Sequence, residues 1–383
     1  MKIACTADWH LHNFTEFSRT LSVVFNEATN RYQEFPDNTE FHTIEMNSRL
    51  FNILNGLCDM RDYCEKEKIS HVLMAGDMFH HRGTIDVSVF NSAYRVLKSF
   101  KDTGINIHAI AGNHDQVDAS VVPSSSLHTL SEVIHVIEKP ELFSISQIQI
   151  AAVPFSKDKK HVISAIRELE KSCDDVSQSI LVTHLGLSGG KVGSGMYSMN
   201  DEFTLKDLHS TKWKYVVVGH YHQPQLLSGN TFYCGSPLQN NFGDELPYSE
   251  EYGGHNGFFV VDTNRRCEID FVPINAPRFL TVTSESNFQE DELKGNYIRI
   301  RTKADKADKI QEKVSEILKN EPHQDVRLEL EKDYVQEHRS DIGVVQSLED
   351  TIRIYAKENC SDMDKLENLT SYGINILNET LGG

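Results

Sequence analysis

Five short clusters of aspartate, asparagine and histidine are the residues of this sequence whose types and spacing could do chemistry. In chain order they contain Asp8 and His10, Asp77, Asn113 with His114 and Asp115, His184, and His220 with His222. Their side chains offer carboxylate oxygens, one amide oxygen and imidazole nitrogens, with no thiolate. Two divalent metal ions that share a bridging carboxylate would use such a set. Mixed oxygen and nitrogen ligation suits manganese, iron or zinc better than magnesium, and the many hard ligands make Mn²⁺ the first expectation.

Each cluster directly follows a segment with the apolar pattern of a strand. The predicted strands are Lys2–Thr6, His71–Ala75, Ile105–Ala111, Ile148–Val153, Ser179–Thr183, Tyr215–Val218, Thr231–Cys234, Phe258–Asp262 and Glu268–Val272. Helical patterns lie between several of them, for example over Asn47–Lys66, where apolar residues recur at spacings of three and four. Alternating strands and helices predict an α/β domain over residues 1–275, with ligands beyond the carboxyl ends of the strands.

The spacing within the clusters has physical reasons. A glycine precedes Asp77, Asn113 and His220, and is expected to let the backbone turn with φ > 0 as it leaves each strand. His114 follows a ligand without being needed as one. Asp115, next to it, could accept the imidazole N–H and hold that ring protonated and oriented.

Single residues of these types carry little information. A lone histidine such as His71, His108 or His135 is usually structural or surface-exposed, and a lone Gly-Asp is usually a turn. Five clusters in order, each after a predicted strand, are much harder to explain as purely structural. We therefore expect one active site at one edge of the sheet.

Composition sets wider limits. A chain of 383 residues has room for two or three domains, and 39% hydrophobic residues without a long apolar run are typical of a globular protein that does not span a membrane. Seven cysteines without a CxxC pair argue against a disulfide framework and a zinc ribbon. The N-terminus reaches Asp8 too early for the apolar core of a signal peptide, so a reducing, cytoplasmic location is expected.

The net charge of −18 does not resemble the basic footprint of a nucleic-acid-binding protein. Acidity alone favours a small-molecule or protein substrate. Bound divalent cations or a local basic face can make the electrostatic potential at a site positive, so the net charge does not identify the class of substrate.

The residues after 275 form two further units. A strand, a helix and a strand are expected over Asn296–Thr302, Asp305–Lys319 and Val326–Leu330, and this small α/β module is assigned residues 276–338. The basic residues of 299–319 are either a solvated helix face or a contact to phosphate. Two amphipathic helices over 339–383 must cover their apolar stripes with the chain's own body or a partner. Residues 13–40 are expected to be an insertion.

The motif order DxH, GDxF, GNHD, a strand-terminal histidine and GHxH resembles the calcineurin-like metallophosphoesterase superfamily. The stretch Gly235-Ser236-Pro237 after GHxH resembles more narrowly the SbcD-type nuclease subunits of double-strand-break processing complexes. This resemblance implies an αββα β-sandwich flanked by helices in four layers, then a small capping domain that binds DNA, and C-terminal helices. Residues 340–383 would dock on an SbcC-type coiled-coil ATPase, and the chain would form a homodimer.

For the site, the resemblance implies that Asp8, His10, Asp77 and His222 hold one metal ion. Asp77, Asn113, His184 and His220 would hold the other. His114 would stabilise developing charge or protonate the leaving oxygen, and His80 would either contact the scissile phosphate or support the site from behind.

The implied activity is a two-metal DNA exonuclease on double-stranded ends and endonuclease on single strands, in repair and recombination. The alternatives are a small-molecule phosphoesterase or protein phosphatase with the same site, and a scaffold that has lost activity. A scaffold is expected to lack a ligand or His114, and neither is missing.

Overall fold

The computed structural model describes residues 1–35, 43–117, 124–193, 197–198, 203–245, 252, 254–265, 267–284, 286, 290–319, 325–330, 356–357, 366 and 368–374. Residues 1–329 form one compact unit and residues 330–383 a second. Within 339–383 the described residues are helical, and the rest of the predicted helix pair lies outside the described residues. The predicted domain boundaries at 275/276 and 338/339 stay predictions.

Two six-stranded sheets form the first part of the chain. The first sheet has the order β17 (Ile269–Pro273), β16 (Gly257–Asp262), β1 (Lys2–Thr6), β5 (His71–Met74), β6 (Asn106–Ile110) and β7 (His135–Ile137). The second has the order β14 (Gln225–Ser228), β15 (Thr231–Tyr233), β13 (Tyr215–Gly219), β10 (Ile180–His184), β9 (Ile148–Val153) and β8 (Glu141–Ile145). In both sheets the central strands are parallel, so their carboxyl ends meet at one edge.

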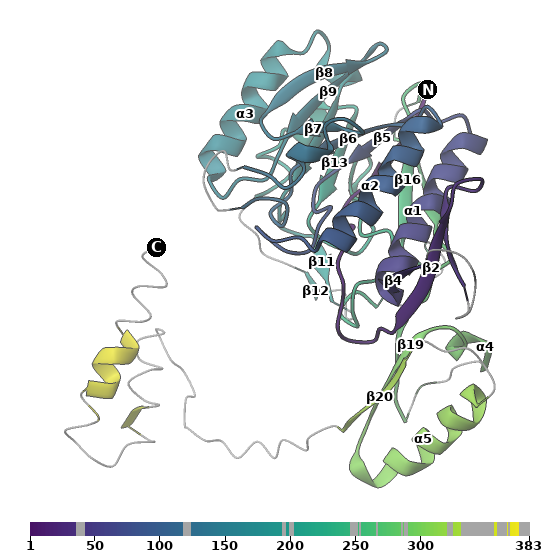
Figure 1. The fold of residues 1–383 in the computed structure, drawn as a ribbon. Helices are drawn as coiled ribbons and strands as arrows, with labels where there is room; N and C mark the ends of the chain where they lie inside the picture. Colours follow the sequence, from purple (N-terminus) through teal and green to yellow (C-terminus); the bar gives the residue numbers. More distant parts are fainter. Residues whose placement is uncertain are drawn as a thin grey trace. The chain divides into compact units, whose positions relative to one another are not determined.

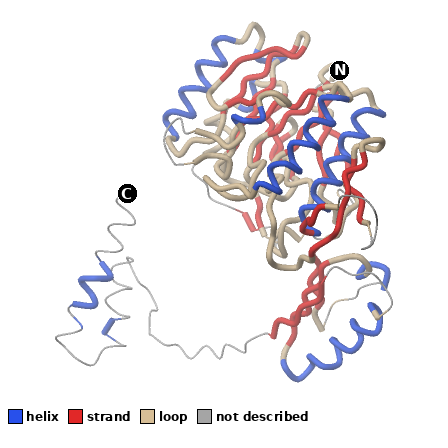
Figure 2. Tube along the Cα trace, in the orientation of Figure 1, coloured by secondary structure: helices blue, strands red, loops and turns tan. Residues whose placement is uncertain are grey.

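Helices cover the outer faces of the two sheets. Helices α1 (Ser48–Lys66) and α2 (Val87–Asp102) lie side by side (Figure 1) and share a core with the first sheet through residues such as Leu54 and Val72. Helix α3 (Lys159–Ser172) packs on the second sheet through Ile166. A third core, which includes Cys5 and Val182, fills the space between the sheets. The strands therefore lie between helices (Figure 2), and the predicted α/β fold with its four layers is confirmed.

The sequence pattern located these elements closely because their apolar faces are regular. Strands β1 and β9 have the predicted bounds, and α1 begins one residue after the predicted start. Its N-cap is Asn47, whose side chain accepts the backbone N–H groups of Arg49 and Leu50. Shorter connecting elements are η1 (His128–Leu130), η2 (Val176–Gln178), η3 (Ser210–Lys212), β11 (Lys191–Val192) and β12 (Tyr197–Ser198).

The insertion contains structure that the sequence analysis did not predict. An antiparallel sheet is formed by β2 (Thr20–Asn26), β3 (Arg31–Glu34) and β4 (Ile44–Asn47). Leu21 and Val23 of β2 are buried against the α1 side of the molecule. Strands β3 and β4 have only four residues each and few apolar ones, so the alternation that marks a strand is weak there. Strand β2 has seven residues and contains Leu21, Val23, Val24 and Phe25, but it lies within an otherwise polar segment.

The module after residue 275 has one more strand than predicted. Strand β18 (Phe279–Val282) pairs in parallel with β19 (Tyr297–Thr302), which also neighbours β20 (Asp325–Leu330). Helices α4 (Glu290–Leu293) and α5 (Ala304–Leu318) complete this capping module, and residues such as Val314 and Ile298 form its own core. Strand β18 is only four residues long and begins two residues after Pro277, so its apolar pattern is too short to predict a strand from the sequence.

Candidate metal centre

The predicted ligands lie where the parallel strands end. Asp8 follows β1, Asp77 follows β5, Asn113 follows β6, His184 is the last residue of β10, and His220 follows β13. The polar ends of two different sheets are thus brought to one edge of the sandwich. This is the placement expected from the sequence.

The backbone turns sharply at this edge. Asp8 and Asp77 have φ values of 54° and 59°, His10 has 47° and His220 has 109°. Residues other than glycine rarely adopt positive φ, and such strain collects at functional sites where the surrounding structure over-determines it. The turn directs each of these side chains back toward the strand ends.

The glycines serve two different purposes, which corrects the sequence prediction. Of the three, only Gly76 has positive φ, at +94°. Gly112 and Gly219 are needed for close approach: a Cβ on Gly112 would lie 2.2 Å from Asp77 Oδ1, and one on Gly219 would lie 2.0 Å from the carbonyl oxygen of Ala75. Neighbouring loops pass so close at these two points that no side chain fits.

Carboxylates and histidines converge in two overlapping groups. Ligand atoms of Asp8, His10 and His222 lie within 4.8 Å of one another, as do those of Asp8, Asp77 and His184. Asp77 Oδ2 is 3.3 Å from His184 Nε2 and 3.8 Å from His10 Nε2. Asp77 therefore lies between the two predicted metal positions, as a bridging ligand must.

Asn113 joins the second group through its side-chain oxygen. Asn113 Oδ1 is 2.9 Å from His184 Nε2 and 3.1 Å from His220 Nδ1. The other ring nitrogen of His184, Nδ1, donates to the carbonyl of Ala75 at 2.7 Å. This backbone contact orients the ring so that Nε2 faces the carboxylates, as bonds behind a metal ligand commonly do.

The residues present fit a pair of divalent cations. His10 is 1% exposed, and its Nε2 is a buried polar atom without a hydrogen-bond partner among the described residues. An orphaned buried nitrogen that faces a carboxylate is costly unless a cation or a proton occupies the space between them. All seven predicted ligands are within this cluster, and none is placed elsewhere.

Burial and charge set the protonation of these histidines. Burial lowers the pKa of His10 well below its usual value and that of His220 to about 3, so both rings are neutral and have a lone pair to donate. Burial also lowers the pKa of His184, but the Asp77 carboxylate outweighs it and raises that pKa to about 9. A metal ion would compete with that proton for the ring, so metal binding is expected to release protons.

Asp244 was missed by the sequence analysis. Both of its carboxylate oxygens are 3.1 Å from His222 Nδ1, and it raises the pKa of His222 to about 9 against the opposing effect of burial. Asp244 follows a glycine in a loop rather than a strand, so it was not distinguishable from an ordinary turn residue. Its contact leaves Nε2 of His222 as the ring nitrogen that can bind a cation.

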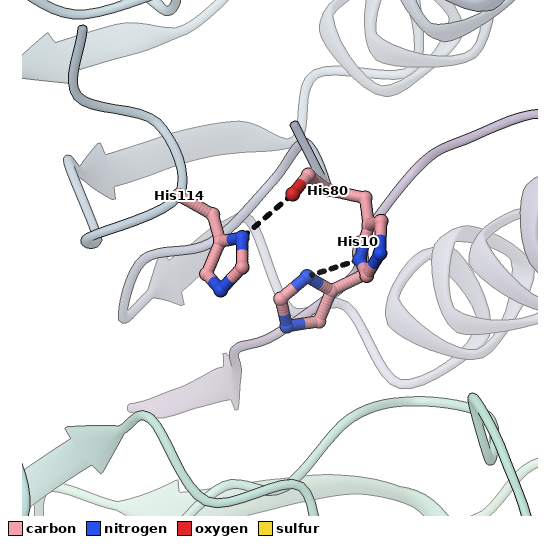
Figure 3. Close-up of side chains that lie close together, drawn as sticks. All are labelled: His10, His80 and His114. Carbon is pink, nitrogen blue, oxygen red and sulfur yellow. Dashed lines mark hydrogen bonds between the residues drawn. The ribbon is translucent and has the colours of Figure 1, made fainter. Parts of the chain in front are cut away.

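His114 and His80 lie beside His10 (Figure 3), and the ligand atoms of all three rings are within 4.8 Å of one another. His114 Nδ1 donates to the backbone carbonyl of His80 at 2.6 Å, and His80 Nδ1 is 3.3 Å from His10 Nδ1. His114 therefore has Nε2 available for a substrate. His80 contacts His114 through its backbone carbonyl and His10 through its ring, and the two roles predicted for its side chain stay predictions.

Asp115 has different partners from those predicted. It is fully buried and accepts four backbone N–H groups, from Asp77, Met78, Phe79 and Gly112, at 2.8 to 3.1 Å. Both Asp115 and His114 are among the described residues, and no hydrogen bond joins the carboxylate to the imidazole, so the prediction that Asp115 orients that ring is wrong. Asp115 instead fixes the two ligand loops to each other, because one carboxylate satisfies donors from both.

Comparison with known proteins agrees with this geometry. The sequence profile described as calcineurin-like phosphoesterase matches residues 1–224. The chain belongs to the calcineurin-like phosphoesterase family. The predicted superfamily and class of enzyme are thereby confirmed, and the cluster of aspartate and histidine at the strand ends supports two divalent metal ions.

Two curated relatives are nucleases by name, and a third is named as a DNA repair protein. Exonuclease subunit 1 of Enterobacteria phage T4 is 25% identical over 225 residues, which are 58% of this chain and 61% of that protein. The SbcD subunit of nuclease SbcCD from Bacillus subtilis is 24% identical over 286 residues, with 64% and 63% covered. DNA double-strand break repair protein Mre11 of Methanopyrus kandleri is 26% identical over 247 residues, with 58% and 52% covered.

These matches are partial. The chain spans about three fifths of the length of the first two relatives named above. Among solved structures, the alignment with a dimetal phosphatase from Danio rerio covers 68% of this chain and 91% of that chain at 10% identity, with a TM-score of 0.35. Among the described helices, none combines the length and apolar character that a membrane span requires.

Proposed function

We propose that this calcineurin-like phosphoesterase is a DNA nuclease that hydrolyses phosphodiester bonds with two divalent metal ions, most readily Mn²⁺. The observation that supports it most is the convergence of Asp8, Asp77 and the histidines beside His114, in a chain whose relatives include nucleases. Exonuclease action on double-stranded ends and endonuclease action on single strands, in repair and recombination, are parts of this proposal.

The chain's residues have distinct tasks in this reaction. Two bound cations would polarise the phosphodiester and lower the pKa of a water molecule that attacks phosphorus. His114, held through Nδ1 by the His80 carbonyl, presents Nε2 to stabilise charge on the phosphate or to protonate the leaving 3′ oxygen. Asp8 is fixed because both of its oxygens accept the backbone N–H of His220, at 3.1 and 3.0 Å.

A test of this proposal is cleavage of end-labelled linear duplex DNA by the purified chain in Mn²⁺, in Mg²⁺ and in chelator. A phosphomonoester is assayed in parallel, and His114→Ala is the control. Manganese-dependent degradation of the DNA that is lost in His114→Ala would support the nuclease. Hydrolysis of the monoester with intact DNA would contradict it and favour the alternative, a small-molecule phosphoesterase or protein phosphatase.

The proposed partner is an SbcC-type coiled-coil ATPase that binds residues 340–383. Two relatives are named as subunits, and this chain contains no GxxxxGK[ST] sequence that would bind ATP phosphates by itself. In the described helical residues of this segment, Leu369 is 52% exposed and Tyr372 is 70% exposed, as expected of a docking face. Leu369→Glu in the full chain should abolish co-elution with the ATPase and leave the chain's own DNA cleavage unchanged.

A homodimer through the helices of the catalytic domain, in the Asn47–Lys66 and Asp86–Lys101 regions, is the remaining proposed partnership. Both regions are helical, as α1 and α2. Sedimentation equilibrium of the full chain tests this directly, and a monomer at micromolar concentration would contradict it.

A further inference from the structure

The loop of residues 236–245 directly follows Gly235 and begins with Ser236-Pro237. Its first residues are attached to the metal centre. The Ser236 N–H donates to the carbonyl of His222 at 2.9 Å. Asn256 donates from Nδ2 to the carbonyl of Ser236 at 3.0 Å. The beginning of this loop is therefore fixed to the backbone of a predicted metal ligand.

The same loop is attached to the capping module by hydrogen bonds. Gln239 Oε1 accepts the N–H of Phe279 at 2.6 Å. Glu245 accepts the N–H of Thr281 at 2.8 Å and the hydroxyl of Thr281 at 2.6 Å. Phe279 and Thr281 both belong to β18, so these bonds join the loop to the first strand of the capping module.

Packing strengthens this attachment. The ring centroid of Phe242, in the loop, is 4.9 Å from that of Phe279 and 5.0 Å from that of Phe17. The guanidinium carbon of Arg299 lies over the Phe242 ring, 4.3 Å from its centroid. Arg49 of α1 is 7% exposed and donates to the carbonyl of Asn240. Aromatic and cation–π contacts of this kind make the loop part of the interface between the capping module and the sheet domain.

The end of the loop returns to the metal centre. Asp244 accepts from His222 Nδ1 with both oxygens and from the backbone N–H of Asn240 at 2.9 Å. Asp244 is adjacent to Glu245, which bonds to β18. One peptide bond therefore separates the carboxylate that orients a metal ligand from the carboxylate that fixes the capping module.

We propose that the loop 236–245 couples the position of the capping module to the orientation of His222, with Asp244 and Glu245 as positioning residues. A displacement of β18 must either break its bonds to Glu245 and Gln239 or move residue 245 and the neighbouring Asp244 with it. In the second case the His222 ring turns, and its affinity for a metal ion changes. The inference rests on the proposed function in that His222 binds a metal ion.

The coupling must be reciprocal. If the position of the capping module changes the affinity of His222 for a cation, then cation binding changes the freedom of the capping module by the same free energy. Nucleic acid that moved the capping module would thereby adjust one of the two metal positions. Metal binding alone should also be detectable in β18, without any substrate.

The first experiment is titration of the metal-free full chain with Mn²⁺, with free Mn²⁺ measured by electron paramagnetic resonance. Asp244→Ala should weaken one of the two Mn²⁺ sites by about 10- to 100-fold, the usual effect of removing a carboxylate behind a metal ligand. Glu245→Ala should weaken the same site by about fivefold, the worth of one or two hydrogen bonds. Glu245→Gln should restore the affinity, because its amide can accept from the Thr281 N–H and donate to the Thr281 hydroxyl.

A double variant and a matched control separate coupling from general loss of stability. If Glu245 acts through Asp244, the double alanine variant should bind Mn²⁺ no more weakly than Asp244→Ala alone. Glu170→Ala is the matched control. Glu170, a residue of α3, also accepts two side-chain hydrogen bonds, from His209 and Lys212. This variant should leave both Mn²⁺ affinities unchanged.

The second experiment is hydrogen exchange of the β18 amides with and without Mn²⁺. Mn²⁺ should slow their exchange in the wild type and in Glu170→Ala, and the effect should be lost in Glu245→Ala. Wild-type Mn²⁺ affinity in Glu245→Ala, or additive losses in the double variant, would overturn the coupling. A chain that passes these tests but cleaves no DNA would overturn the proposed function alone.

Discussion

Histidines gather in two regions of the sheet domain, one where the strands of both sheets end and one on the first sheet, and the two regions behave differently. At the carboxyl ends of the strands, His10, His184 and His222 surround carboxylates. Away from that edge, His71 Nδ1 is 3.1 Å from His108 Nε2, and His108 Nδ1 is 3.1 Å from His135 Nδ1. The second group, the histidine row, is thus as closely spaced as the first.

The difference lies in where the ring nitrogens point. In the histidine row, each nitrogen of His108 faces a different neighbour, and the row ends at Glu141, 3.2 Å from His135 Nε2. Among the described residues, no three ligand atoms of the row converge, whereas three such groups form at the strand ends, and two of them contain Asp8. Convergence of the ligand atoms, and not the number of histidines, distinguishes a candidate metal centre.

The strongest test of this contrast is Asp77→Ala. Asp77 Oδ2 faces His10 of one predicted ligand set and His184 of the other, so its loss should reduce hydrolysis of DNA at least about a thousandfold. The measurement is the rate of cleavage in saturating Mn²⁺. His108→Phe, in the histidine row, should keep the wild-type rate within about twofold, and a similar loss in both variants would remove the distinction between the regions.

Two histidines beside the metal centre should differ in effect. His114→Ala removes the Nε2 that faces substrate and should lower kcat by about 100- to 1000-fold, the usual worth of a general acid. His80→Ala keeps the backbone carbonyl that accepts from His114, so it should cost about tenfold or less. Both variants should still bind Mn²⁺. A larger loss in His80→Ala than in His114→Ala would reverse these roles.

Asp115 should prove structural. Asp115→Ala leaves four backbone N–H groups of the ligand loops without their acceptor, and should lower the free energy of unfolding by about 3 kcal/mol. Urea unfolding of the metal-free chain measures this. Unchanged stability with a loss of activity would show instead that Asp115 takes part in the reaction.

The smallest expected effect is on the pH dependence of stability in the histidine row. Burial lowers the pKa of His108 to about 3, below the value of about 6.5 in the unfolded chain, so the folded state binds fewer protons between these values. Its contribution to stability is complete above pH 6.5 and is lost as the pH falls toward 3. When the pH falls from 7 to 5, the free energy of unfolding, measured in urea, should decrease in both proteins. The decrease should be about 1–2 kcal/mol smaller for His108→Phe than for the wild type.

Sequence reasoning found what local patterns encode. The strands before Asp8 and Asp77, and the convergence of the seven predicted ligands at the strand ends, could be anticipated, because apolar runs followed by polar turns are visible in the sequence. The acceptor for His114 could not, since it is the backbone carbonyl of His80. Asp244 was missed because its relation to His222 arises only when the loop folds back.

The strands of the insertion and β18 were missed for a related reason. Strands β3, β4 and β18 have only four residues each, and β18 is stabilised by packing against distant parts of the chain, as Phe279 is by Phe17 and Phe242. The reason for glycine at positions 112 and 219 could not be predicted either, because the neighbouring loop that leaves no room for a side chain is distant in the sequence.

The central claim is that the strand-end cluster holds two divalent ions. Its most direct test is the number of Mn²⁺ ions retained per chain after equilibrium dialysis of the wild type, Asp77→Ala and His108→Phe. We predict two ions for the wild type and for His108→Phe, and fewer than one for Asp77→Ala. Two ions retained by Asp77→Ala, or their loss in His108→Phe, would contradict the account.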